Sequence, residues 1–328
     1  MKKAVSVLLA LALLASAVFA QGGAEGKASS PKRLTFGTSS SGGNFYLVGG
    51  GLSTLINNKL GDKFVVTAEE TGGSSANLAG IEQGEMDLGI SMTSAIAQGL
   101  DGTAKWANGK KMENVRGLLP LYPSYLTIYT LASSPIRTLK DFKGHIVGLG
   151  SKGAAMDAVF REVLPLMDAV PASVFNDGHS ATATAVGQGQ VDAALLFSLP
   201  PFASIAELEA SHSLRFIPLT QDEINFLTSN YSFYTPAVMP KGSYKGTTED
   251  VPTVSEWNML VCSAKLSEDD VYALVKMFCE NNPDLVSIYK GLTYATAENE
   301  KYFNLPLHPG VIKYLKEIGV EVPANLIG

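Results

Sequence analysis

The chain is poor in cysteine, with two in 328 residues, Cys262 and Cys279. It has no C-x-x-C pair and no cysteine–histidine set with the spacing of metal ligands. That absence excludes a zinc-ribbon domain and a small scaffold held together by several disulfides. Two states stay open for the pair: a single disulfide or two buried free thiols.

Charge is also scarce, and its balance is negative. Asp, Glu, Lys and Arg make up 17% of the residues, and the net charge at pH 7 is −6. Because proteins bind nucleic acid by neutralising phosphates with Lys and Arg, this composition argues against nucleic acid as a partner, and we expect none. The small share of charge and the 32 glycines favour a well-buried α/β core joined by tight turns.

Long apolar runs are missing except at the N-terminus, so we expect no membrane-spanning helix in the mature chain. A basic start and the apolar run Ala4–Ala15 precede small residues at Val18 and Ala20, which is the pattern of a secretory signal peptide. No cysteine follows at the cleavage point, which argues against a bacterial lipid anchor. We predict a signal peptide at 1–20, a flexible lead-in at 21–31, and a mature periplasmic or extracytoplasmic protein.

Signatures of catalysis are absent as well. The four histidines lie in no triad context, and the chain has no G-x-S-x-G, H-E-x-x-H or Walker loop. Asp87 and Asp192 lie at equivalent strand starts, where a structural role in a turn or cap explains them better than acid–base catalysis. We therefore expect no enzyme activity, no cofactor and no metal.

The sequence does contain a short motif that occurs twice. Gln83–Ile90 reads QGEMDLGI, and Gln188–Leu195 reads QGQVDAAL. In each copy Gly ends a helix-like stretch, and Asp enters a short apolar strand that opens into a polar or proline-containing loop. Two such joints at half-chain spacing predict two similar α/β lobes. Ligands of open α/β sheets bind where the strands end, so facing lobes would form a cleft there.

The first half alternates regularly between apolar strands and helices. Strands at 34–37, 64–69 and 86–91 are separated by helix-like stretches at 45–59 and 74–83. Such alternation predicts a parallel, doubly wound sheet. The fold class expected for each lobe is therefore α/β.

Two extended segments are candidates for the connections between the lobes. A long strand pattern is broken at Tyr122–Ser124, and a second extended segment lies at Pro236–Pro240. We predict that the chain leaves lobe 1 at the first and returns at the second. Lobe 1 would then hold residues 32–122 and 236–328, and lobe 2 would hold 123–235. Two crossover strands would act as a hinge that opens and closes.

Polar loops follow the lobe 1 strands and precede its helices, at 38–46, 71–77 and 91–94. Helix N-termini carry unpaired N–H donors and partial positive charge, so they favour anions. Lys152, beside Ser151, would add a positive charge from lobe 2, against the alternative of a solvated loop lysine. Ordinary capping is the alternative explanation for each loop alone, whereas three such loops at consecutive strand ends favour a ligand site.

Three tyrosines, Tyr46, Tyr125 and Tyr234, are candidate aromatic walls, with ordinary partly buried packing as the alternative. The candidate ligand-binding residues are Thr38, Ser39, Gly43, Asn44, Phe45, Tyr46, Thr71, Gly73, Ser74, Asn77, Ser91, Thr93, Ser94, Ser151, Lys152, Ser198 and Tyr234.

At these loops the sequence resembles a known family. Gly37–Tyr46 is similar to the GTGxxGxYY opening of TAXI-type solute receptors, the binding proteins of one class of TRAP transporters. Thr71–Asn77 looks like their TGGSxxN segment, and Gln83–Ile90 resembles their GxxDLGI step. The similarity continues through Ser267–Tyr272 and through His308–Gly310 near the C-terminus, so it covers nearly the whole mature chain.

The resemblance implies a two-lobed periplasmic-binding-protein fold, type II-like, with two crossover strands and no catalysis. It implies binding of a small anionic or zwitterionic solute of the glutamate, glutamine or 2-oxoglutarate kind. The receptor would deliver this solute to a TRAP membrane permease. We expect a monomer that does not itself span the membrane.

Two departures from the family pattern bear on the ligand. The second-lobe loop, which usually reads GxxGSGT, is Gly150–Met156 here, with two hydroxyls missing and Lys152 gained. The first Tyr of the YY pair is Phe45. A site that loses hydroxyl donors binds polar groups less well on that side unless Lys152 compensates. Helix N-termini and Lys152 keep an acidic solute as the first expectation.

Two other functions stay open on the same fold. One is the receptor of an ABC-type importer. The other is an exported enzyme such as a transferase or hydrolase, against which the missing catalytic constellation argues.

Overall fold

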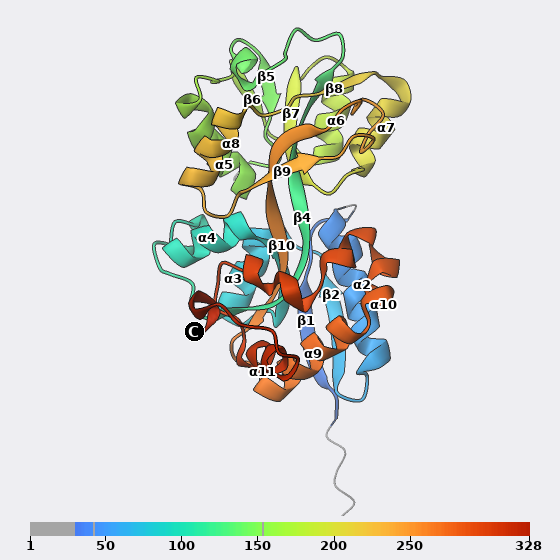
Figure 1. Cartoon of the computed structure of the whole chain (residues 1–328), viewed down its shortest axis with the longest axis vertical. Helices are drawn as coiled ribbons and strands as arrows, with labels where there is room; N and C mark the ends of the chain where they lie inside the picture. Colours follow the sequence, from blue (N-terminus) through green and yellow to red (C-terminus); the bar gives the residue numbers. More distant parts are fainter. Residues whose placement is uncertain (1–29, 42, 153) are drawn as a thin grey trace, which may run out of the picture.

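The computed structural model describes residues 30–41, 43–152 and 154–328. The predicted signal peptide at 1–20 and nearly all of the lead-in at 21–31 lie outside the described residues. The rest forms two α/β lobes joined by long strands (Figure 1). Within the described ranges no helix is long and apolar enough to cross a membrane.

Lobe 1 is built as the strand–helix alternation predicts. Its parallel strands β1 and β2 pair in register from Lys32↔Phe64 to Gly37↔Glu69, and β3 lies on the other side of β1. The strands are β1 (Lys32–Gly37), β2 (Phe64–Glu69) and β3 (Leu88–Met92), and the covering helices are α2 (Asn44–Lys59), α3 (Ser74–Gln83), α4 (Thr93–Asp101), α9 (Glu268–Glu280), α10 (Asn282–Ile288) and α11 (Pro309–Glu317). Short 3₁₀ turns complete it: η2 (Lys105–Ala107), η4 (Lys290–Tyr294), η5 (Ala297–Tyr302) and η6 (Ala324–Leu326).

Lobe 2 repeats this plan with shorter strands. Its parallel strands are in the order β7-β5-β6. β8 and β9 pair instead with the two long strands that connect the lobes. The elements are η3 (Leu139–Phe142), β5 (Ile146–Gly148), α5 (Ala155–Leu166), β6 (Ser173–Phe175), α6 (His179–Gly187), β7 (Ala193–Ser198), α7 (Ala203–Ser211), β8 (Leu214–Phe216), α8 (Gln221–Asn230) and β9 (Thr235–Met239).

The repeated motif forms the same helix-to-strand connection in both lobes. Gly84 and Gly189 have φ of +79° and +70°, a left-handed conformation that glycine adopts without strain. Asp87 Oδ2 then accepts the backbone N–H of Thr35 at 2.9 Å, and Asp192 Oδ2 accepts that of Ile146 at 2.8 Å. Each aspartate thus fixes the start of a neighbouring strand, which is the turn and capping role that its position predicts.

Two long antiparallel strands, β4 (Val115–Leu131) and β10 (Val251–Ser263), run from one lobe into the other (Figure 1). They pair from Ser255↔Tyr125 to Ser263↔Val115, and β4 goes on to pair with β7. The sheet order is β2-β1-β3-β10-β4-β7-β5-β6. One continuous sheet therefore passes through both lobes, with the β4–β10 pair at its centre.

The crossover strands differ from the sequence-based expectation in two ways. β4 is not broken at Tyr122–Ser124, because shifts in its register with β10 accommodate its two prolines. The return strand is β10, and not the segment Pro236–Pro240. That segment is β9, an edge strand on β10, and Met239 is buried in a lobe 2 core cluster. Its extended, proline-containing sequence is equally typical of an edge strand.

Both cysteines are free. Cys262 is fully buried on β10, and Cys279 is partly buried on α9. Burial raises the pKa of both thiols, that of Cys279 to about 12. Of the two states that the sequence left open, the structure has the free thiols, and burial keeps them unreactive.

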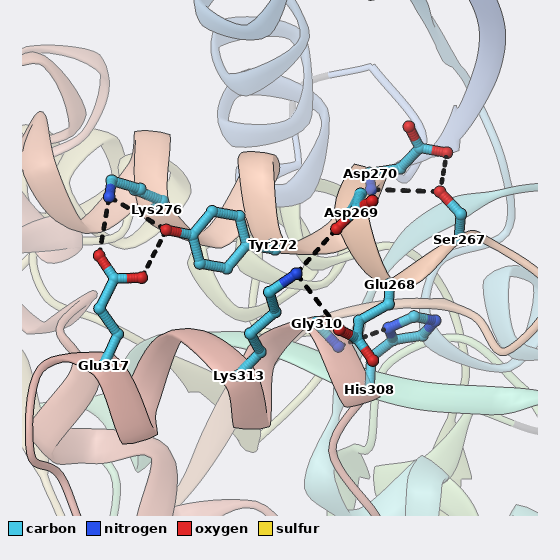
Figure 2. Close-up of polar contacts among 10 residues, drawn as sticks. All are labelled: Ser267, Glu268, Asp269, Asp270, Tyr272, Lys276, His308, Gly310, Lys313 and Glu317. Carbon is cyan, nitrogen blue, oxygen red and sulfur yellow. Dashed lines mark hydrogen bonds and ion pairs between the residues drawn. The ribbon is translucent and has the colours of Figure 1, made fainter.

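Ion pairs join α9 to α11 (Figure 2), and the starts of these two helices are the C-terminal segments that resemble TAXI receptors. Lys313 Nζ reaches Asp269 at 2.8 Å and Glu268 at 3.3 Å, and Lys276 Nζ reaches Glu317 at 2.9 Å. His308 caps α11, where its Nδ1 accepts the N–H of Gly310 at 3.2 Å. This network lies at the end of lobe 1 away from lobe 2 (Figure 1), so its visible role is packing.

Candidate functional site

The first group of predicted site residues ties the ends of the lobe 1 strands together. Asn77 Nδ2 donates to the carbonyls of Thr38 and Ile90, both at 2.8 Å. Thr71 Oγ1 donates to Asn77 Oδ1 at 2.7 Å and accepts the N–H of Gly73 at 3.0 Å. Since Thr38 and Asn77 are fully buried, these side chains serve the scaffold that positions the loops.

Two further residues of these loops also have internal partners. Ser74 Oγ accepts the N–H of Met92 at 3.1 Å, which joins the start of α3 to the end of β3. Ser91 is fully buried, and its hydroxyl donates to the Met92 carbonyl at 3.3 Å. The loops lie at the strand ends as predicted, and their polar side chains satisfy the backbone there.

The turn before α2 and the first residues of that helix carry five more candidates: Ser39, Gly43, Asn44, Phe45 and Tyr46. Ser39 Oγ accepts the N–H of Tyr46 at 3.2 Å, while the side chain of Tyr46 is 46% exposed. Phe45 packs against the lobe 1 core. Asn44 Nδ2 donates to the Tyr289 hydroxyl at 3.3 Å, which connects this helix start to the far end of the lobe 1 sequence.

The N-terminus of α4 meets both lobe 2 and the strand β10. Thr93 Oγ1 accepts the N–H of Trp257 at 3.3 Å and donates to the carbonyl of Phe233 in lobe 2 at 3.4 Å. The N–H of Ser94 donates to Glu256 Oε2 at 3.2 Å. A carboxylate is favoured at a helix N-terminus. The protein's own Glu256 therefore occupies the place where the sequence suggested a solute anion.

Glu256 is the most perturbed acid at the hinge. It is 1% exposed, and burial raises its pKa to about 7, with the Ser94 hydrogen bond acting in the opposite direction. Burial also raises the pKa of Tyr234, with a further contribution from Glu256. The Tyr234 ring stacks on Phe197 at 5.2 Å. One signal in the sequence could have pointed to this cluster: Glu256 is the single charged residue in the segment that forms β10.

The remaining lobe 2 candidates are divided between surface and interior. Ser151 and Lys152 are exposed in the turn before α5. Ser198 is buried at the end of β7, opposite Tyr125 in the strand register. These contacts place the predicted residues without establishing which of them touch a solute, so their binding role stays a prediction.

A pocket of about 370 Å³ lies between the lobes, beside the crossover strands. Tyr125 of β4 lines it, as expected for one of the candidate aromatic walls. Lobe 2 contributes Leu199, Pro200, Pro201, Pro240 and Ser243, and lobe 1 contributes Tyr289, Lys290, Gly291, Thr293 and Tyr294. Apart from Tyr125, sequence reasoning missed these residues, because η4 carries neither a motif nor a periodic pattern.

The lobes approach closely at one edge of this pocket. A Cβ on Gly291 would lie 2.6 Å from Leu199 Cδ2 of lobe 2 and 2.6 Å from Tyr289 Cε1. Only a residue without a side chain fits between them in this arrangement. A second hollow, about 660 Å³, is lined by lobe 1 alone, between Glu82 and Glu113. The pocket between the lobes is therefore the one whose shape depends on how the lobes meet.

The pocket has the character of a small-molecule site, which is concave and largely apolar with a few polar groups. Its polar groups are tyrosine hydroxyls, Ser243, Thr293 and the Lys290 ammonium. Within the described ranges no cluster of three or more His, Cys, Asp or Glu could hold a metal.

Replacing Asn77 with Ala should lower the free energy of unfolding by about 2 to 3 kcal/mol, because two carbonyls lose their amide donor in the interior. Urea unfolding would show a lower midpoint with an unchanged slope. Asn230→Ala is the matched control, since its amide bonds only the exposed Phe226 carbonyl. Equal midpoints for the two variants would contradict this role of Asn77.

Glu256→Gln should change how stability depends on pH. The folded protein holds the Glu256 proton up to about pH 7, whereas the unfolded chain releases it near pH 4.3. The free energy of unfolding of the parent protein therefore falls by on the order of 3 kcal/mol as the pH rises between these two values. Above pH 7 this contribution no longer changes with pH. Glutamine stays neutral and keeps an acceptor for Ser94.

Urea unfolding of both proteins from pH 4.5 to 8 measures this difference. The variant should match the parent near pH 4.5 and become the more stable of the two as the pH approaches 7. The exposed Glu249, changed to Gln, serves as the control and should track the parent. A stability difference between Glu256→Gln and the parent that is independent of pH would refute the assignment.

Solved structures with similar folds include periplasmic-binding-type proteins. One concerns glutathione import through GshT and the cystine ABC importer TcyBC of Streptococcus mutans. It has a TM-score of 0.53 and 14% identity, covering 83% of this chain and 100% of that one. Another is a histidine kinase sensor domain described as similar to periplasmic binding proteins. It has a TM-score of 0.50 and 12% identity, covering 81% of this chain and 98% of that one.

XAC2383 from Xanthomonas citri, bound to ATP, is similar at a TM-score of 0.50 and 11% identity, covering 87% of this chain and 95% of that one. At these identities the likeness shows the fold alone, and it confirms the predicted two-lobed periplasmic-binding-protein architecture. The finer resemblance to TAXI receptors stays a prediction. A family model described as NMT1-like matches residues 36–319, most of the chain, and the protein therefore belongs to the NMT1-like family.

Proposed function

We propose that the protein is an extracytoplasmic solute receptor, which binds a small solute between its lobes and delivers it to a membrane importer. The observation that carries this proposal is the 370 Å³ pocket to which both lobes contribute side chains. A solute that contacts both walls binds one arrangement of the lobes better than others. Binding would therefore shift the population toward that arrangement, and the importer could recognise it.

The described residues favour capture of the solute over its conversion. No acidic side chain and no imidazole lines the pocket in the part of the chain that the structure describes. Two histidines have structural partners elsewhere: His145 lies 3.2 Å from Asp192, and His308 caps α11. A general acid–base pair at the solute is thus missing, so we propose a receptor without turnover.

The importer that we favour is of the ABC type. The structure concerned with glutathione import through an ABC importer is similar over 83% of this chain, which supports that class at the level of the fold. A TRAP permease is the second candidate. It is supported by the loops Gly37–Tyr46 and Thr71–Asn77, which resemble the corresponding segments of TAXI receptors.

A solute that binds this receptor should also compact it. Small molecules released from the purified protein by denaturation, identified by mass spectrometry, name the solute to test. Adding it back should raise the melting temperature and reduce the radius of gyration in small-angle scattering. Binding without any compaction would contradict closure of the lobes.

The location of the site has its own matched pair of variants. Tyr294→Ala removes a wall of the pocket between the lobes and should weaken binding of that solute. Lys111→Gln alters only the hollow on lobe 1 and should leave binding unchanged. The reverse result would place the site in lobe 1 and remove the main support for the proposal.

Uptake energetics separate the two importer classes. In cells that carry the protein and its permease, uptake of the identified solute should stop when ATP is depleted. It should persist when an ionophore collapses the ion gradients while ATP is maintained. Uptake that follows the ion gradient and continues without ATP would assign the receptor to a TRAP permease. A receptor variant with Tyr294→Ala controls for uptake by other routes.

A further inference from the structure

The pocket between the lobes carries charge of one sign only. Lys290 is the one charged side chain that lines it among the described residues, and it is exposed and has no ion pair there. An ammonium at the wall of a pocket attracts anions and repels cations. The bound group nearest Lys290 should therefore be negatively charged.

The same lining offers nothing to a solute ammonium group. Glu256, the buried acid at the hinge, is engaged with the N–H of Ser94 and does not line the pocket. Glu209 in lobe 2 is likewise taken up by the N–H groups of Lys245 and Gly246. An amino acid would bring its amine into a pocket with no carboxylate to pair it. Burying an unpaired charge is strongly unfavourable.

Aromatic rings and prolines form much of the wall of the pocket. Tyr289 is held by ring contact with Tyr122 at 5.1 Å, and Tyr294 lies edge-on to Trp257 at 6.3 Å. Tyr125 and the prolines of lobe 2 supply further flat apolar surface. Such walls favour a planar apolar body, through area burial and ring stacking. Tyrosine faces also attract cations, but Lys290 in the same pocket opposes them.

One tyrosine hydroxyl is arranged to donate to an anion. The Tyr289 hydroxyl accepts the Asn44 amide N–H at 3.3 Å, and its own proton has no acceptor within the described ranges. Burial raises the pKa of Tyr289 to about 12, so the hydroxyl keeps this proton at neutral pH. Tyr289 and Lys290 both line the pocket, and a tyrosine hydroxyl and an ammonium are both donors of the kind that bind a carboxylate or sulfonate.

We propose that the solute is a compact organic anion with no amino group and with a planar apolar body, bound by Lys290 and Tyr289. This inference rests on the proposed function of the pocket as the solute site. It narrows the expectation drawn from the family resemblance, since it disfavours glutamate and glutamine on account of their amine.

Matched probe pairs test each part of the proposal by calorimetric titration of the purified protein. 3-Phenylpropionate and L-phenylalanine differ only in the α-amine, as do glutarate and L-glutamate. 3-Phenylpropanamide removes the charge and keeps the ring. We expect 3-phenylpropionate to bind about ten-fold or more tightly than each of the other probes, a difference of about 1.4 kcal/mol or more.

Two variants locate the anion. Lys290→Gln and Tyr289→Phe should each lower the affinity for 3-phenylpropionate by about three- to ten-fold, since each removes one proposed partner of the carboxylate. Lys290→Gln should weaken the uncharged 3-phenylpropanamide less than it weakens 3-phenylpropionate, because the amide carries no charge for the ammonium to attract. Lys111→Gln, which removes a lysine from the hollow on lobe 1, is the matched control and should bind 3-phenylpropionate as the parent does.

The opposite results overturn the inference. Tighter binding of L-phenylalanine or L-glutamate than of their amine-free partners would refute the exclusion of amines, and tighter binding of glutarate would refute the planar body. If no probe binds, the proposed ligand class is wrong. The receptor function is judged separately, by whether a solute released on denaturation binds again and whether Tyr294→Ala abolishes that binding.

Discussion

The antiparallel pairing of β4 and β10 is the constraint on which the rest of the structure depends. These two strands are shared by both lobes and set the distance and orientation at which the lobes face each other. Tyr125 stands where β4 is paired with both β10 and β7, and it is also a wall of the pocket. A change in the twist of this strand pair therefore moves a pocket wall directly, which couples solute contact to the angle between the lobes.

The buried contacts at the start of α4 act on the same strand pair. Thr93 and the Ser94 N–H hold Trp257 and Glu256 of β10, and Thr93 also reaches the Phe233 carbonyl of lobe 2. Helix α4 is thus fastened to the crossover strand and to the other lobe at once. An anion-favouring helix end is used here for internal attachment. The partners that we propose for a solute anion, Lys290 and Tyr289, lie elsewhere, in the lining of the pocket.

The features that the sequence predicts are those encoded over short distances. The alternation of strands and helices, the two Gly–Asp joints and the loops at the strand ends all follow from local patterns, and the fold confirms them. The side chains of Thr38, Thr71 and Asn77 turn inward because buried carbonyls at the strand ends need donors. The return along β10 and the role of η4 depend on long-range register, which local patterns do not encode.

The residues that line the pocket also limit how far the ligand class of the resembled family can be assigned to this protein. Loops such as Thr71–Asn77 identify a scaffold, because their side chains hold strand ends and helix starts in place. The groups that line the pocket between the lobes lie instead on η4 and on the loop after β7, where composition can change without disturbing that scaffold. A lining with one lysine, three tyrosines and no carboxylate selects against amines whatever the loops resemble. Ligand class is therefore argued better from the lining of the pocket than from the motifs that support it.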